Sequence, residues 1–135
     1  MLTHYIKTYP LGLLVTLAIL VLSLAPIPEV PAVEDVPLAD KWTHMVMYAT
    51  LTLTIWWQYL RSHKCISWQR LIVLGVLAPA AWGGLMELAQ AYLTTYRSGD
   101  WWDFVANSIG VVIGVVLGLA VRVKVGGRDS KLNAQ

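Results

Sequence analysis

Ten polar residues fall in three short segments of the sequence, and their types suit acid–base chemistry. They are Asp40, Lys41, His44 and Tyr48, then Glu87 and Gln90, and then Arg97, Asp100, Asp103 and Asn107. A histidine titrates near pH 6.5, roughly, so His44 is a candidate general base or acid. We expect Asp40 or Asp103 to orient His44, and we expect Glu87 to serve as a proton donor.

The other members of this set are candidates for holding a ligand. Lys41 and Arg97 could bind a phosphate, the arginine through two parallel hydrogen bonds. Further donors and acceptors come from Gln90, Asp100, Asn107 and Tyr48. Histidine and carboxylate side chains are acceptable ligands of Zn²⁺, but Lys41 and Arg97 would repel a cation. We therefore predict no metal at this site and no resident cofactor.

The spacing within each segment places these side chains on single helix faces. Residues three or four apart share a face of an α-helix, as His44 does with Asp40, Lys41 and Tyr48. Glu87 and Gln90 are also three apart, and Asp100, Asp103 and Asn107 follow one stripe. Three helices thus present three polar faces. Polar groups are costly against lipid, so we expect these faces to meet one another.

The rest of the sequence predicts the helices that carry these faces. Hydrophobic residues make up 57% of the chain and charged residues 13%, against about 25% charged residues in an ordinary soluble domain. This composition disfavours disorder, coiled coils and free nucleic-acid binding. A single cysteine excludes an internal disulfide. Four apolar spans approach the roughly 20 residues that cross a bilayer, at about 9–25, 42–60, 71–91 and 104–121. We predict an all-α fold, with residues 1–135 forming one integral membrane domain of four transmembrane helices.

The first span also has features of a signal peptide. Lys7 resembles a charged flank, and Ser23 with Ala25 resembles a cleavage site. Pro26 would follow the cut and disfavours cleavage there. We expect the span to be retained as a helix, which places both chain ends on the same side of the membrane.

The charges predict which side of the membrane this is. Eight of the ten basic residues lie in the two tails or between the second and third spans, namely Lys7, Arg61, Lys64, Arg70, Arg122, Lys124, Arg128 and Lys131. Seven of the eight acidic residues lie toward the other side, namely Glu29, Glu34, Asp35, Asp40, Glu87, Asp100 and Asp103. Basic residues favour the cytoplasmic side, so both termini are predicted to be cytoplasmic. The three polar faces then meet at the extracytoplasmic boundary.

Two further patterns each leave two interpretations open. Gly110, Gly114 and Gly118 form a small-residue stripe that lets another helix approach closely. That helix could belong to the same chain, or to a second copy in a homodimer. The loop with Pro26, Pro28, Pro31 and Pro37 should be extended. It could cover the outer mouth of the bundle or simply connect two helices.

The three polar segments also resemble those of VanZ-like proteins. Asp40 to His44 resembles the family's Asp-Lys-x-x-His segment, and Gly84 to Gln90 resembles its segment containing Gly, Glu and Gln. Arg97 to Gly110 resembles its Arg-x-x-Asp-x-x-Asp-x-x-x-Asn-x-x-Gly segment. The resemblance implies a multi-pass helical protein of the bacterial cell membrane. The family's namesake is associated with teicoplanin resistance.

Three hypotheses about the polar cluster follow. The first is an enzyme, a hydrolase or transferase, that acts on a lipid-linked or cell-envelope substrate at the outer leaflet. The second is a module that binds a lipid headgroup or a glycopeptide without chemistry. In the third, Lys41 and Arg97 merely neutralise the carboxylates and lock the helices together. All three predict membrane lipids as partners and no nucleic acid.

Overall fold

The protein is helical throughout the part that the structure describes. This computed structural model describes residues 2–26, 38–63, 65–95 and 99–132. Its elements are α1 (Leu2–Thr8), α2 (Pro10–Leu24), α4 (Ala39–Ser62), α5 (Trp68–Ile72), η1 (Val73–Leu77), α6 (Ala78–Leu93) and α7 (Trp101–Leu132). The predicted all-α class is confirmed. Of the proline-rich loop, Pro28, Pro31 and Pro37 lie outside the described residues.

The four predicted apolar spans correspond to α2, to α4, to the continuous helical segment formed by α5, η1 and α6, and to α7. α2 lies within its predicted span, whereas the other three helical segments extend beyond theirs, because helical hydrogen bonding continues past the apolar residues. The short helix α1 was not predicted, since no apolar span covers it. Pro10 begins α2, where a proline is tolerated because the first helical N–H has no partner.

The element η1 is a π-helical segment, and it is followed by a proline in the first turn of α6. Pro79 has no N–H to donate to the Gly75 carbonyl four residues earlier, so the regular helical pattern is interrupted there. The indole of Trp56 donates to that carbonyl at 3.3 Å. Trp56 of α4 thus supplies the hydrogen-bond donor that the Gly75 carbonyl lacks, because Pro79 has no N–H.

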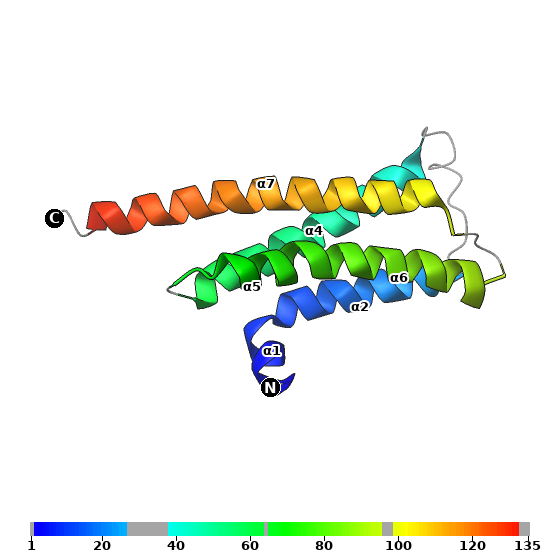
Figure 1. Ribbon diagram of the computed structural model, residues 1–135, viewed down its shortest axis with the longest axis horizontal. Coiled ribbons are helices and arrows are strands. Elements are labelled where there is room, and N and C mark those ends of the chain that lie inside the picture. The colour runs from blue at the N-terminus through cyan, green and yellow to red at the C-terminus, as the bar shows by residue number, and fades with distance from the viewer. Residues whose placement is uncertain (1, 27–37, 64, 96–98, 133–135) are drawn as a thin grey trace.

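The four long helices lie side by side, with α4 and α7 running in one direction and α2 and α6 in the other (Figure 1). The contact between α4 and α7 depends on the glycine stripe. A Cβ atom at Gly114 would lie 2.6 Å from Cβ of Thr52, and one at Gly118 would lie 2.8 Å from the ring of Trp56. A Cβ at Gly110 would overlap the carbonyl of Met45. The stripe therefore packs within the chain, which is the first of the two interpretations left open by the sequence.

Two buried clusters fill the interior between the helices. One comprises Ile19, Tyr48, Leu51, Met86 and Val111, and the other comprises Tyr9, Trp56, Tyr59 and Leu71. Many large apolar side chains of all four helices remain on the outer surface. Within the described residues, two helices are long and apolar enough to cross a membrane, Trp68–Leu93 and Trp101–Arg122. The apolar helix α2 is shorter, at 15 residues.

Candidate functional site

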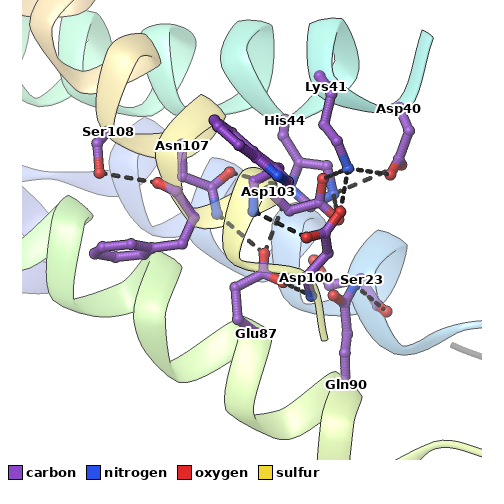
Figure 2. Close-up of polar contacts among 12 residues, drawn as sticks. Ser23, Asp40, Lys41, His44, Glu87, Gln90, Asp100, Asp103, Asn107 and Ser108 are labelled. Atoms are coloured by element: carbon purple, nitrogen blue, oxygen red, sulfur yellow. Dashed lines mark hydrogen bonds and ion pairs between the residues drawn. The ribbon is translucent and has the colours of Figure 1, made fainter. Parts of the chain in front are cut away.

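Most of the predicted polar residues that the structure describes collect at one end of the molecule, where α4 and α7 begin and α6 ends (Figure 2). The directions of the helices cause this convergence. Asp40, Lys41 and His44 lie in the first turns of α4, and Asp103 and Asn107 lie in the first turns of α7. Glu87 lies in the last turns of the antiparallel helix α6. We call this group, together with Asp100, the polar cluster.

Lys41 is the cation around which three carboxylates are arranged. Its Nζ donates to Oδ2 of Asp100 at 2.7 Å and to Oδ1 of Asp103, and it lies 3.6 Å from Oδ2 of Asp40. Burial lowers the pKa of Lys41, but its hydrogen bonds to Asp100 and Asp103 outweigh this effect and raise the pKa above its usual value. The ammonium is therefore held in its charged form. It joins the start of α4 to the start of α7.

Asp100 has a second role at the start of α7. Its Oδ1 accepts a hydrogen bond of 3.0 Å from the N–H of Trp102, and its carbonyl accepts from the N–H groups of Asp103 and Phe104. This is the capping pattern of an acidic residue before a helix. The hydrogen bond from Lys41, followed by that from Trp102, lowers the pKa of Asp100. Asp100 is therefore both a helix cap and an ion-pair partner.

His44, Asn107 and Glu87 form a chain of hydrogen bonds across three helices. Nδ1 of His44 lies 3.0 Å from Oδ1 of Asn107, and Nδ2 of Asn107 donates to Oε1 of Glu87 at 3.2 Å. Oε2 of Glu87 accepts from the backbone N–H of Asp100 at 3.3 Å. With the Asn107 amide in this orientation, its oxygen requires a proton on Nδ1 of His44. A neutral His44 then presents Nε2 as an unprotonated base.

Nε2 of His44 points toward Asp40 and Asp103. It lies 3.7 Å from Oδ1 of Asp40 and 3.8 Å from Oδ2 of Asp103, both beyond hydrogen-bond distance. The side chain of His44 is 4% exposed, whereas that of Asp40 is 58% exposed. The reactive nitrogen is thus held on a buried ring beside an accessible carboxylate. A water molecule or a substrate atom between these groups could contact all three.

The same three side chains are the candidates for holding a metal among the described residues. One ligand atom each from Asp40, His44 and Asp103 lies within 4.8 Å of the others. Such a donor set suits a borderline ion such as Zn²⁺. Lys41 already binds Asp103 and lies beside Asp40, so its positive charge opposes a cation here.

Two other predicted site residues that the structure describes lie apart from this group. Gln90 is buried, but its amide donates to the carbonyl of Ser23 at 3.0 Å and so joins α6 to α2. Tyr48 packs in the apolar core, and its hydroxyl has no hydrogen-bond partner among the residues that the structure describes. Arg97 lies outside the described residues.

A groove beside the polar cluster was not predicted from the sequence. It has a volume of about 340 Å³ and lies between the end of α6 and the start of α7. Most of its lining is apolar and includes Leu88, Trp101 and Phe104, while Glu87 and Asp100 provide the polar part. The spacing of the small residues Gly84 and Ala91, seven apart on one face of α6, was the available indication, since small side chains leave room beside the helix.

The opposite end of the molecule also has a cavity, of about 420 Å³. Tyr9, Tyr59, His63 and Arg70 contribute to its lining. His63 stacks on Tyr59 with ring centroids 4.3 Å apart, and its Nδ1 lies 3.1 Å from the carbonyl of the same residue. No acidic side chain lines this cavity among the described residues.

Comparison with known proteins gives a sequence relative but no function. Over 115 residues the chain is 31% identical to an uncharacterized protein of the fission yeast Schizosaccharomyces pombe. The match covers 84% of this chain and 65% of the yeast protein. No protein-family model matches the chain, and no solved structure matches it. The function must therefore be inferred from the geometry of the polar cluster.

Proposed function

We propose that the chain is a multi-pass membrane protein whose four long helices all cross the bilayer. The support is that polar side chains lie between the helices, whereas large apolar side chains lie on the outer surface. His44, Thr52, Gln58 and Asn107 are buried between the helices. The outer surface carries large apolar side chains from all of the long helices. They include Leu14, Leu17 and Val21 of α2, Val46 of α4, Leu77 of η1, Leu85 of α6, and Val112 and Val116 of α7. Soluble monomers rarely expose such extensive apolar surface, whereas lipid favours it.

The polar interior also explains why α4 is less hydrophobic than the other helices. Its buried side chains include His44, Thr52 and Gln58, which lower the mean hydropathy without facing lipid. The basic residues predict that the loop after α4 and both termini are cytoplasmic. The polar cluster then lies at the extracytoplasmic boundary. Placement in the bacterial cell membrane rests on the resemblance to VanZ-like proteins.

Cys65 provides a test of this topology. It is exposed in the loop after α4, and it is the chain's only cysteine. A membrane-impermeant maleimide added to intact cells should leave Cys65 unlabelled and should label it after lysis. In the variant Cys65→Ser/Trp101→Cys, the new thiol should react in intact cells. Labelling of Cys65 in intact cells would contradict the proposed orientation.

We further propose that the polar cluster acts on a lipid-linked or cell-envelope substrate as a hydrolase or transferase. One observation carries this proposal: the hydrogen-bond chain from Glu87 through Asn107 orients His44 so that Nε2 faces the accessible Asp40. A buried imidazole held in this way is suited to take a proton from an attacking water or hydroxyl. Glu87 borders the groove and could return a proton to the leaving group.

Lys41 contributes to this mechanism through the carboxylates. Its ion pairs with Asp100 and Asp103 hold two acids close to His44 without leaving their charges uncompensated. Asp103 then faces Nε2 with its second oxygen and can stabilise the imidazolium that forms after proton transfer. Binding of a substrate phosphate by Lys41 would require one of these ion pairs to open.

The resemblance to VanZ-like proteins supports an envelope substrate. A role in teicoplanin resistance is one form of this proposal, in which the substrate is a cell-wall precursor. The binding alternative, in which the cluster holds a lipid headgroup or a glycopeptide without turnover, is supported by the groove that adjoins the cluster.

The enzyme and binding alternatives differ in what happens to the lipid. We would reconstitute the purified protein in vesicles of a bacterial polar lipid extract and follow the lipids by mass spectrometry. An enzyme should remove or transfer the headgroup of one lipid class in a time-dependent manner. A lipid that copurifies and stays unaltered on prolonged incubation supports the binding alternative and contradicts an enzyme of this class.

The structural alternative is tested by Glu87→Gln. This variant keeps the shape of Glu87 but removes its charge and one of its two acceptor oxygens. We expect it to stay folded and to lose turnover. If folded protein and turnover fall in the same proportion, the cluster serves only to hold the helices together.

A further inference from the structure

The groove between α6 and the start of α7 has the size and the position of a ligand site. Its volume of about 340 Å³ lies within the range of roughly 300–1,000 Å³ that is usual for small-molecule sites. Glu87 joins the groove to the His44 hydrogen-bond chain, and Asp100 joins it to Lys41. A molecule in the groove would therefore contact the polar cluster directly.

The outer margin of the groove continues into the apolar outer surface. Tyr92 is 82% exposed and Trp101 is 81% exposed, and both line the groove. Exposed Leu85 of α6 and Val105 of α7 extend the apolar surface beyond it. A hydrocarbon chain could thus pass from the bilayer into the groove without crossing a polar barrier.

Gly84 gives the groove part of its depth. A Cβ at this position would lie 3.5 Å from the ring of Phe104, at ordinary van der Waals distance. A Cβ is therefore accommodated at residue 84 in contact with Phe104, and the helix itself does not require a glycine there. A larger side chain at residue 84 should fill the groove without disrupting the packing of α6 on α7.

The charges beside the groove favour a ligand with a positive group. Even with Glu87 protonated, as its role as proton donor requires, the polar cluster has three carboxylates, from Asp40, Asp100 and Asp103, and among its described residues Lys41 is the permanent cation. The excess of acid would repel an anionic headgroup and attract an ammonium group.

We propose that the groove holds one hydrocarbon chain of a membrane lipid whose headgroup carries an amine, with the ammonium group near Glu87 and Asp100. This inference rests on the proposed function and assigns its substrate class. It differs from the phosphate recognition expected for Lys41, because the carboxylates, rather than the lysine, meet the headgroup. The apolar walls of the groove select a lipid over a free amine of the same headgroup chemistry.

The experiment measures binding without turnover. The purified full-length protein in detergent is mixed with equal amounts of phosphatidylethanolamine and phosphatidylglycerol, and the bound lipid is identified by native mass spectrometry. We expect phosphatidylethanolamine to be favoured by about tenfold, the effect of roughly one favourable charge interaction in a partly buried site. Equal binding of the two lipids, or a preference for phosphatidylglycerol, would overturn the headgroup assignment.

Two variants test the groove itself. Gly84→Leu should reduce phosphatidylethanolamine binding about tenfold, because the new side chain occupies the space of one or two methylene groups of the lipid. Leu88→Phe adds bulk one helical turn away on the same face of α6, at an exposed position, and should act in the same direction. Ala120→Leu adds the same side chain to an exposed surface of α7 far from the groove, and its binding should equal that of the wild type. Wild-type binding by both groove variants would overturn the proposal.

Asp100→Asn tests the headgroup contact. Asparagine can still cap α7, so the helix start is preserved while the charge is removed. We expect the preference for phosphatidylethanolamine over phosphatidylglycerol to fall toward one. A preference equal to that of the wild type would show that Asp100 does not meet the headgroup.

The groove proposal and the proposed enzymatic function can be contradicted separately. His44→Ala should bind phosphatidylethanolamine as the wild type does, because His44 does not line the groove. If the groove variants lose binding while His44→Ala retains turnover, the proposed role of His44 is wrong and the groove is supported. If His44→Ala loses turnover while the groove variants bind normally, the catalytic proposal is supported and the groove proposal is wrong.

Discussion

The two ends of the molecule bury polar side chains in different ways. At the end with the polar cluster, the side chains bond one another across α4, α6 and α7, as in the chain His44–Asn107–Glu87. At the opposite end, polar side chains mainly bond backbone groups. Trp56 donates to the carbonyl of Gly75, and the hydroxyl of Tyr59 bonds both backbone groups of Ser67.

Polar groups that hold helices together thus differ in their hydrogen-bond partners from polar groups that are suited to chemistry. A backbone partner satisfies a buried polar atom without a second titratable side chain. Side chains that bond one another place several ionisable groups in one space, and such groups are typical of functional sites. The cations differ as well. Arg61 lies over the ring of Trp57 and Arg122 over that of Trp68, at the surface, whereas Lys41 is surrounded by carboxylates.

The largest expected effect comes from replacing one buried amide at each end. Asn107→Leu removes the partner that orients His44, so turnover should fall about 100-fold, at the lower end of what general acid–base catalysis contributes. Gln58→Leu removes the acceptor of the Gly12 N–H, a bond of 2.8 Å. It should cost about 1–3 kcal/mol of unfolding free energy and leave turnover per folded molecule unchanged.

Turnover assays on the folded fraction, isolated by size exclusion, check this pair. An equal loss of turnover in both variants would remove the distinction between the two ends. A selective loss in Asn107→Leu would sharpen it, because the two substitutions remove the same functional group.

The next largest effect concerns the two cations. Lys41→Met leaves the buried Asp103 without its ion-pair partner and should lower the unfolding free energy by about 2 kcal/mol. The value is below that of a fully buried pair because the Lys41 side chain is 25% exposed. Arg61→Met removes a surface contact with Trp57 and should cost only about 0.5 kcal/mol. Denaturant titration of both variants in the same detergent measures the difference, and equal costs would contradict the organising role of Lys41.

The smallest expected effect is a dependence of stability on pH. The hydrogen bond from Lys41 lowers the pKa of Asp100 in the folded protein. Its contribution is therefore complete above the unfolded pKa of about 3.9 and is lost as pH falls through the lower folded value. Melting temperatures measured between about pH 3 and pH 7 should fall on the acidic side, and less steeply in Asp100→Asn. An identical acid dependence in that variant would show that the pair does not contribute.

Much of the polar cluster could be predicted because its causes are local. The helical period places Asp103 and Asn107 on one face, and the alternating directions of the helices bring that face to His44 and Glu87.

The pairing within the cluster could not be predicted, because it depends on how the helices are rotated against each other. The contacts of Gly110 and Gly114 with α4 set that rotation for α7 and bring Asn107 to His44. The packing of α6 on α2 turns Gln90 to Ser23 in the same way. The groove depends similarly on how Phe104 approaches Gly84. The spacing of residues in the sequence shows which helix face each residue occupies. It does not show which residue of another helix that residue contacts.

The central claim, that one end of the molecule performs chemistry and the other holds the helices, is tested most directly by its two histidines. His44→Ala and His63→Ala would be compared in the same vesicle assay of lipid headgroup turnover. We predict that His44→Ala loses turnover by at least about 100-fold while remaining folded, and that His63→Ala retains the wild-type rate. Full turnover by folded His44→Ala, or an equal loss in both variants, would contradict the claim.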